Sequence, residues 1–103
     1  MKPHPLFQAM ALVVLAAAPS IQVLAADAET CQRYANQADK DSLYRERSCP
    51  QIPYDASWSR DRSYHYNWCL DAAEVDVAAQ TEARGDALIK CGVITKSTRR
   101  EHF

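Results

Sequence analysis

Small side chains form one stripe in the stretch that follows an apolar leader. Its steps of four, three, four and seven residues run through Cys31, Ala35, Ala38, Ser42 and Cys49. These steps match one face of an α-helix, and small residues let a second helix approach closely. Asp27 can cap this helix, and Pro50 ends it because the residue before a proline is pushed toward extended conformations. We expect a first helix over 27–48.

A second helical stretch follows a turn at 50–55 that contains two prolines. Asp55 or Ser57 can cap it, and Gly92 stands where a C-terminal cap belongs. One face of this stretch carries Ala83, Ala87, Leu88 and Cys91. Within 71–77, β-branched residues alternate with acids. The second helix is therefore either continuous to its end or broken in that segment.

The apolar leader is typical of a signal peptide. Lys2 precedes an apolar run over 6–18, and Val23 and Ala25 occupy the −3 and −1 positions of a cleavage site. The run is shorter than the roughly twenty residues of a membrane-spanning helix. We expect a periplasmic or secreted protein with no stable membrane insertion after cleavage. The expected segments are a signal peptide at 1–25, a helical hairpin domain at 26–94 and a polar C-terminal tail at 95–103.

Composition excludes several classes of protein. The chain has 103 residues, and beyond the leader it holds only nine Val, Leu or Ile side chains. Folds with a deep aliphatic interior, such as Rossmann domains and barrels, are excluded. The formal net charge is −1, and cleavage of the leader removes one more positive charge with Lys2. A mildly acidic domain is poorly suited to bind a phosphate backbone, and we expect no nucleic-acid partner.

Four cysteines in a short exported chain indicate disulfides. Structural zinc sites use closer pairs than Cys31, Cys49, Cys69 and Cys91 provide. Cys31 and Cys49 would lie about 27 Å apart on one helix, too far to bond. With two antiparallel helices, Cys31 would pair with Cys91, and Cys49 with Cys69. The sequence therefore predicts an all-α fold, a disulfide-stapled antiparallel helical hairpin.

Six rings fall between Tyr54 and Cys69. On one helix, Trp58, Asp61, His65 and Trp68 would share a face. These aromatic residues either replace missing aliphatic core or form an exposed surface that binds a protein or a cell-envelope glycan, since Trp, Tyr and Arg dominate interface hot spots. The candidate binding residues are Trp58, Arg60, Asp61, Arg62, Tyr64, His65 and Trp68.

The polar residues do not form a pattern typical of a metal site or a catalytic site. His65 and Asp61 alone are too few to hold a metal, and no glycine-rich elbow accompanies the serines near them. We expect no catalysis, no metal and no cofactor. The charged residues of the first helix, Asp41 included, are expected on a solvated face. The same holds for Arg84 in the second helix, and the tail with Arg99 is expected to fray.

The pattern Cys31-x-x-Tyr34-Ala35, Cys49, Trp58-x-x-Asp61-x-x-x-His65-x-x-Trp68-Cys69 and Cys91 resembles a group of small exported bacterial four-cysteine modules. The resemblance spans most of the chain after the leader. It departs at 50–54, where those modules carry glycines. It implies the same cysteine framework and draws attention to Trp58, Asp61, His65 and Trp68, but it implies no activity.

These observations favour a non-enzymatic exported module that binds a protein or an envelope glycan. One alternative is an acid-responsive periplasmic chaperone, in which protonation of His65 and of carboxylates would loosen the hairpin. A hydrolase working through His65 and Asp61 is the third hypothesis.

Overall fold

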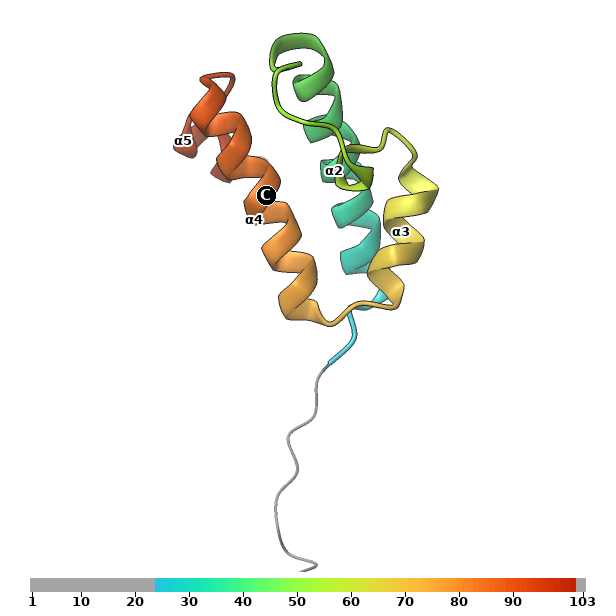
Figure 1. Cartoon of the computed structure of the whole chain (residues 1–103). Helices are drawn as coiled ribbons and strands as arrows, with labels where there is room; N and C mark the ends of the chain where they lie inside the picture. Colours follow the sequence, from blue (N-terminus) through green and yellow to red (C-terminus); the bar gives the residue numbers. More distant parts are fainter. Residues whose placement is uncertain (1–23, 102–103) are drawn as a thin grey trace, which may run out of the picture.

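The computed structural model describes residues 24–101, so most of the predicted signal peptide lies outside the described residues. Within that range the fold is all-α, as predicted, and two disulfides join its helices. The elements in chain order are α2 (Ala28–Ser48), a 3-10 turn η1 (Ala56–Trp58), α3 (Arg62–Leu70), α4 (Glu74–Cys91) and α5 (Lys96–Glu101). In Figure 1, α2 lies between α3 and α4.

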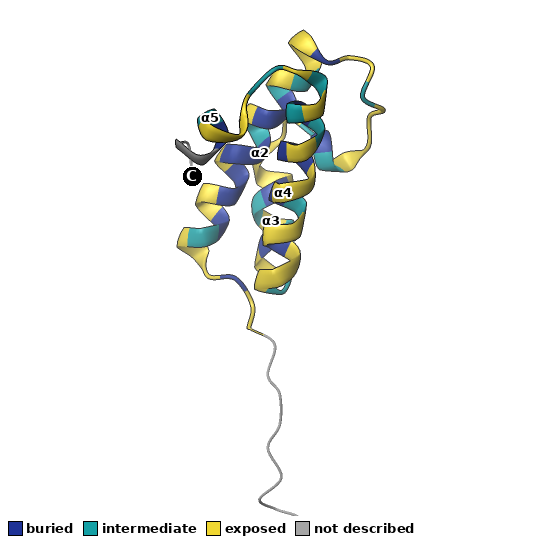
Figure 2. Cartoon of the chain, turned by 90° about the vertical axis from the view of Figure 1, so that its left-hand side faces the viewer, coloured by how far each residue is buried: buried dark blue, intermediate teal, exposed yellow. Residues whose placement is uncertain are grey.

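The first helix forms as the sequence predicts. The carboxylate of Asp27 accepts a hydrogen bond from the backbone N–H of Thr30 at 2.8 Å, and the helix ends before Pro50. Every member of the predicted small-residue stripe is buried. Figure 2 shows buried positions of this kind along the inward sides of the helices. Their small size lets two other helices pack closely against α2.

The second helical stretch is broken, which decides between the two alternatives. Asp55 caps only the short turn η1, and Asp61 caps α3. Residues 71–73 then separate α3 from α4, which has no side-chain cap at its start. There the Glu74 N–H donates to the carbonyl oxygen of Leu24 at 2.9 Å. Gly92 ends α4 in the left-handed region, with φ of 86°, where glycine is favoured.

This break overturns the predicted disulfide pairing. The chain reverses at 71–73, so α3 runs antiparallel to α2 while α4 runs parallel to it (Figure 1). Cys69 therefore meets Cys31 at the start of α2, with 5.5 Å between their Cα atoms. Cys91 meets Cys49 at the other end, at 6.3 Å. The prediction was wrong because it assumed one second helix running in one direction.

Two apolar clusters lie at opposite ends of α2. One surrounds the Cys31–Cys69 disulfide and includes Tyr34 and Val77. The other surrounds the Cys49–Cys91 disulfide and includes Trp58 and Leu88. Apart from Ala35 and Ala38, the buried side chains between them are polar or charged, and we call these polar and charged residues the polar belt. Its members are Gln37, Asp41, Ser42, His65, Thr81, Arg84 and Arg99.

The C-terminal segment is not the frayed tail that we expected, because residues 96–101 form α5. The Arg99 side chain is buried, and its Nη2 donates to the carbonyl oxygen of Thr81 at 2.9 Å. Gly85 makes room for it, since a Cβ added there would lie 2.7 Å from Arg99 Nε. Between residues 24 and 101, none of the helices is both long enough and apolar enough to span a membrane.

Candidate binding site

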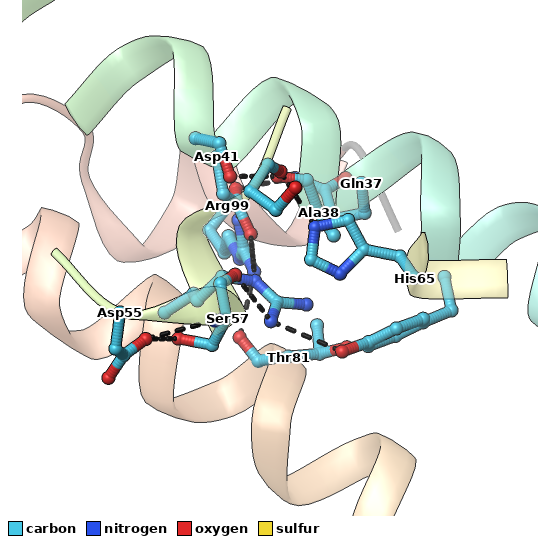
Figure 3. Close-up of polar contacts among 12 residues, drawn as sticks. Gln37, Ala38, Asp41, Asp55, Ser57, His65, Thr81 and Arg99 are labelled. Atoms are coloured by element: carbon cyan, nitrogen blue, oxygen red, sulfur yellow. Dashed lines mark hydrogen bonds and ion pairs between the residues drawn. The ribbon is translucent and has the colours of Figure 1, made fainter. Parts of the chain in front are cut away.

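Asp41 is the centre of the polar belt, with no exposed surface. Gln37 donates to its Oδ1 at 2.9 Å, and both terminal nitrogens of Arg99 bond its carboxylate. Arg84 Nε lies 3.5 Å from Oδ2. Figure 3 shows Asp41 and Arg99 joined in this interior, with His65 pointing toward the same region. One buried carboxylate is thus shared by two buried guanidinium groups.

The prediction that Asp41 and Arg84 lie on solvated faces is wrong, because their exposed fractions are 0% and 1%. Helical phase could have placed both correctly. Asp41 stands three residues after Ala38 on the inward side of α2. Arg84 follows the phase of Val77, Thr81 and Leu88, a spacing of four, three and four.

Arg84 joins the polar belt to a group of aromatic rings. Its Nη1 donates to the hydroxyl of Tyr34 at 3.2 Å and to the carbonyl oxygen of Ser57 at 3.3 Å. Its guanidinium carbon also lies 5.0 Å from the centroid of the Tyr34 ring, a cation–π distance. The hydrogen bond to the Tyr34 hydroxyl and the cation–π contact together hold the ring of Tyr34 in one orientation.

Four rings form a continuous row across α2 and α3. Tyr34 packs against Trp68 with 5.4 Å between ring centroids and meets His65 edge-on at 5.9 Å. Tyr64 meets the other side of His65 at 5.4 Å. Edge-on and tilted arrangements of this kind are the favoured geometries of aromatic pairs.

His65 is buried and contributes one hydrogen bond from its ring. Its Nε2 lies 2.7 Å from the carbonyl oxygen of Ser59. Burial lowers the pKa of His65 below its ordinary value of 6.5, and the positive charge of Arg84 lowers it further. The hydrogen bond to Ser59 opposes this shift without cancelling it. His65 is therefore neutral at pH 7, and Nε2–H is the donor because a carbonyl oxygen can only accept.

A pocket of about 330 Å³ opens over this row of rings. We call it the aromatic pocket. Its rings come from α2 and α3, while η1 and α4 supply polar groups at its rim. The lining residues are Tyr34, Asp55, Ala56, Ser57, Tyr64, His65, Trp68 and Gln80. Drug-sized ligands typically bind in hollows of about 300–1,000 Å³ lined by rings and a few polar groups.

Three of the seven predicted binding residues, Tyr64, His65 and Trp68, therefore lie together in the aromatic pocket. Trp58 does not join them: it is 7% exposed and packs in the cluster around Cys49–Cys91. The expectation of a shared exposed face is wrong for Trp58, because η1 and α3 are separate elements with different directions. The lining residues that sequence reasoning missed are Tyr34, Asp55, Ala56, Ser57 and Gln80.

Arg60, Asp61 and Arg62 hold the start of α3 in place. Arg60 Nε and Arg62 Nε donate to the carboxylate of Asp39 on α2, at 2.7 and 3.2 Å. The Asp61 carboxylate accepts from the backbone N–H groups of Ser63 and Tyr64. Burial raises the pKa of Asp39, but the hydrogen bonds from the two arginines outweigh it and leave this pKa below 3.8.

A larger groove of about 940 Å³ runs between α2 and α4 on the side of α5. Its charged lining has both signs, with Arg33 and Lys96 facing the same space as Glu82 and Asp86. Arg99 also lines it. The rings and converging polar groups of the aromatic pocket make that smaller hollow the better defined ligand site.

Residues 24–101 bring together no group of three or more His, Cys, Asp or Glu side chains that could hold a metal ion. All four cysteines are joined in disulfides.

Comparison with known proteins adds no relative. No protein-family model, curated protein or solved structure matches this chain. A function can therefore be argued only from the geometry of the site itself.

Proposed function

We propose that this chain is an exported, non-enzymatic module that binds a glycan in the aromatic pocket. The observation that carries the proposal is the convergence of four rings from two helices on one hollow with amide, hydroxyl and carboxylate groups at its rim. Sugar rings present apolar C–H faces and hydroxyl edges. Aromatic side chains can cover those faces while polar side chains bond the edges.

Two disulfides support a location in an oxidising compartment, the periplasm or the exterior. The predicted signal peptide points the same way. The disulfides also support the role of a scaffold, since they fix the ends of α3 and α4 against α2. A pocket built across several helices keeps its shape only if those helices stay in register.

The role of Asp61 supports binding over a hydrolase that works through His65 and Asp61. The Asp61 carboxylate accepts from the backbone N–H groups of Ser63 and Tyr64 and so caps α3. The ring of His65 bonds the Ser59 carbonyl through Nε2 instead of the Asp61 carboxylate. Asp61 therefore does not orient His65 as the acidic member of a catalytic triad would.

Titration with the neutral oligosaccharides cellohexaose and chitohexaose, followed by NMR, tests the proposal. We expect shifts at Tyr64, Trp68 and Gln80, and roughly tenfold weaker binding for Tyr64→Ala, since a lost aromatic contact is worth about 0.5–1.5 kcal/mol. Tyr44→Ala is the matched control: Tyr44 and Tyr64 are 40% and 42% exposed, but only Tyr64 lines the pocket. The proposal fails if neither sugar binds or if both variants weaken binding equally.

A protein partner is the outcome to distinguish from a glycan. Ala78 lies on α4 in the larger groove, away from the aromatic pocket. If an envelope protein binds the wild type and Tyr64→Ala alike but not Ala78→Glu, the groove is the functional surface. The glycan proposal would then be wrong.

The acid-responsive chaperone is a second candidate, favoured by one observation. His65 is buried as a neutral ring beside Arg84, so protonation at low pH places two positive charges close together in the interior. Binding of a dye for exposed apolar surface should then increase as the pH falls below the ordinary histidine pKa of 6.5. A flat dye response down to pH 3 would dismiss this candidate.

A further inference from the structure

The polar belt carries more positive than negative charge. Arg84 and Arg99 are buried, and Asp41 is the one carboxylate that both contact. The hydrogen-bond acceptors of Arg84 are neutral: the hydroxyl of Tyr34 and the carbonyl oxygen of Ser57. Buried charges are normally balanced by partners of opposite sign, because an unbalanced charge in the interior is costly.

Arg84 is the unbalanced group. Its Nη2 is buried and has no hydrogen-bond partner among the described residues. Arg99, by contrast, bonds both oxygens of Asp41. A buried donor without a partner costs about 1–3 kcal/mol, and more when it is charged. A structure that retains such a group can use it for a ligand.

The guanidinium of Arg84 is bonded to the lining of the aromatic pocket. Both acceptors of its Nη1, the Tyr34 hydroxyl and the Ser57 carbonyl, belong to residues that line that pocket. Because the Tyr34 oxygen accepts from Arg84, its own O–H can donate to an acceptor in the pocket. A hydroxyl polarised by a cation is a stronger donor, which favours an anionic acceptor.

The same geometry disfavours a cationic ligand. Rings around a pocket can bind an ammonium group through their faces, but Arg84 already lies over the Tyr34 ring at 5.0 Å. A second cation in the pocket would meet the unbalanced charge of Arg84. The one carboxylate in the lining is that of Asp55, and its Oδ1 already accepts hydrogen bonds from the backbone N–H and hydroxyl of Ser57.

We propose that the aromatic pocket selects an acidic sugar, whose carboxylate accepts a hydrogen bond from the Tyr34 hydroxyl in front of Arg84. This inference rests on the proposed glycan-binding function and names the class of sugar. The carboxylate lies beside the Tyr34 hydroxyl, while Oδ1 of Asp55 stays bonded to Ser57. The sugar ring covers Tyr64 and Trp68.

Three tetrasaccharide probes of one length test the charge preference: β-1,4-linked tetraglucuronate, its methyl ester and β-1,4-linked tetraglucosamine. At low salt we expect tetraglucuronate to bind roughly tenfold more tightly than the ester, since hydrogen bonds to charged groups are about twice as strong as neutral ones. The difference should shrink in 0.5 M salt. The tetraglucosamine cation should bind weakest.

Two variants test which residues cause the preference for the acid over its ester. Tyr34→Phe keeps the ring but loses the donor, so the ratio between acid and ester should fall toward one while ester binding persists. Arg84→Gln should have the same effect, with its melting temperature recorded to establish folding. Tyr66→Phe, which removes a hydroxyl outside the aromatic pocket, is the control and should keep the full ratio.

The outcomes separate the two proposals. Equal binding of tetraglucuronate and its ester, or tighter binding of tetraglucosamine, overturns the acidic-sugar inference and leaves glycan binding in place. An undiminished ratio in Tyr34→Phe also overturns it. If none of these probes and neither neutral hexasaccharide binds, both proposals are wrong.

Discussion

The ends and the middle of this molecule are held together by different interactions. Each end has a disulfide inside an apolar cluster, around Cys31–Cys69 and around Cys49–Cys91. The middle has the polar belt, where Asp41 bonds Arg99 and contacts Arg84. Hydrophobic contacts tolerate exchange among residues of similar size, whereas a buried ion cluster requires particular partners.

This difference distinguishes the residues that stabilise the fold from those that form the binding site. The ends hold three helices in place through cross-links and apolar side chains. The belt costs free energy through the unpartnered Nη2 of Arg84, yet Arg84 bonds the Tyr34 hydroxyl in the aromatic pocket. We infer that the ends provide most of the stability and that the binding site forms where the belt meets the Cys31–Cys69 cluster, to which Tyr34 and Trp68 belong.

Removal of a disulfide should have the largest effect. The two bridges close loops of similar length, with sequence separations of 38 and 42 residues. The loop-entropy model therefore gives about 4 kcal/mol for each. We expect Cys31→Ala/Cys69→Ala and Cys49→Ala/Cys91→Ala to lose similar amounts of unfolding free energy, measured by urea denaturation.

The reduced wild type is the control for both double variants, since it keeps the sulfur atoms and opens both loops. A double variant that denatures at the urea concentration of the oxidised wild type would contradict the role given to that end. The belt would then hold the helices without that cross-link.

Asp41→Asn should have the second largest effect. Loss of one partner of a buried ion pair costs about 3–5 kcal/mol, and we expect about 3 kcal/mol because an amide oxygen can still accept from Arg99. Asp39→Asn is the matched control. Asp39 also bonds two arginines, but these are exposed, so at most about 1 kcal/mol should be lost. Equal losses in urea denaturation would remove the distinction between belt and surface.

The sequence predicted the ends of the molecule better than the middle. The stripe from Cys31 to Cys49 and the caps at Asp27 and Gly92 follow from spacing and local backbone preference, and the structure confirms them. The disulfide partners could not be derived in the same way. They depend on the direction of α4, which the reversal at 71–73 sets.

The candidate site was predicted only in part, for a physical reason. Tyr64, His65 and Trp68 stood out by composition, whereas Gln80 and Arg84 reach the site only when α4 folds back along α2. Charge alone suggested that Asp41 and Arg84 are solvated. A buried charge becomes recognisable only when its partner, distant in sequence, is known.

Gly85→Ala should loosen α5 with little change in overall stability. Its Cβ would lie 2.7 Å from Arg99 Nε, so the end of that long side chain must shift, and its bonds to Asp41 weaken without being lost. Alanine also improves the helix propensity of α4 by up to about 1 kcal/mol, which offsets part of the loss. We expect trypsin to cleave after Arg99 several-fold faster, with a change in unfolding free energy of about 1 kcal/mol or less.

Arg99→Gln is the companion to that variant. It should also loosen α5, detected by faster amide exchange at residues 96–99, without any change in α4. If Gly85→Ala is cleaved at the wild-type rate, the contact of Arg99 with the polar belt does not hold α5 in place.

The smallest effect should be the contribution of His65 to the pH dependence of the unfolding free energy. Burial lowers the pKa of His65, so the unfolded chain takes up this proton at a higher pH than the folded one. The unfolding free energy should be unaffected by His65 above pH 6.5 and fall as the pH drops below it. The lowered pKa of Asp39 adds a second fall, below pH 3.8.

His65→Gln should remove the first fall and keep the second, because an amide N–H can still donate to the Ser59 carbonyl while it has no titration in this range. Asp39→Asn should reduce the second fall and keep the first. Urea midpoints measured from pH 8 to pH 3 give the slope of the unfolding free energy against pH in both ranges. A loss of packing that lowers stability equally at every pH leaves these slopes unchanged. If the wild type and His65→Gln lose stability in parallel between pH 7 and pH 5, protonation of the polar belt is not what makes the middle sensitive to acid.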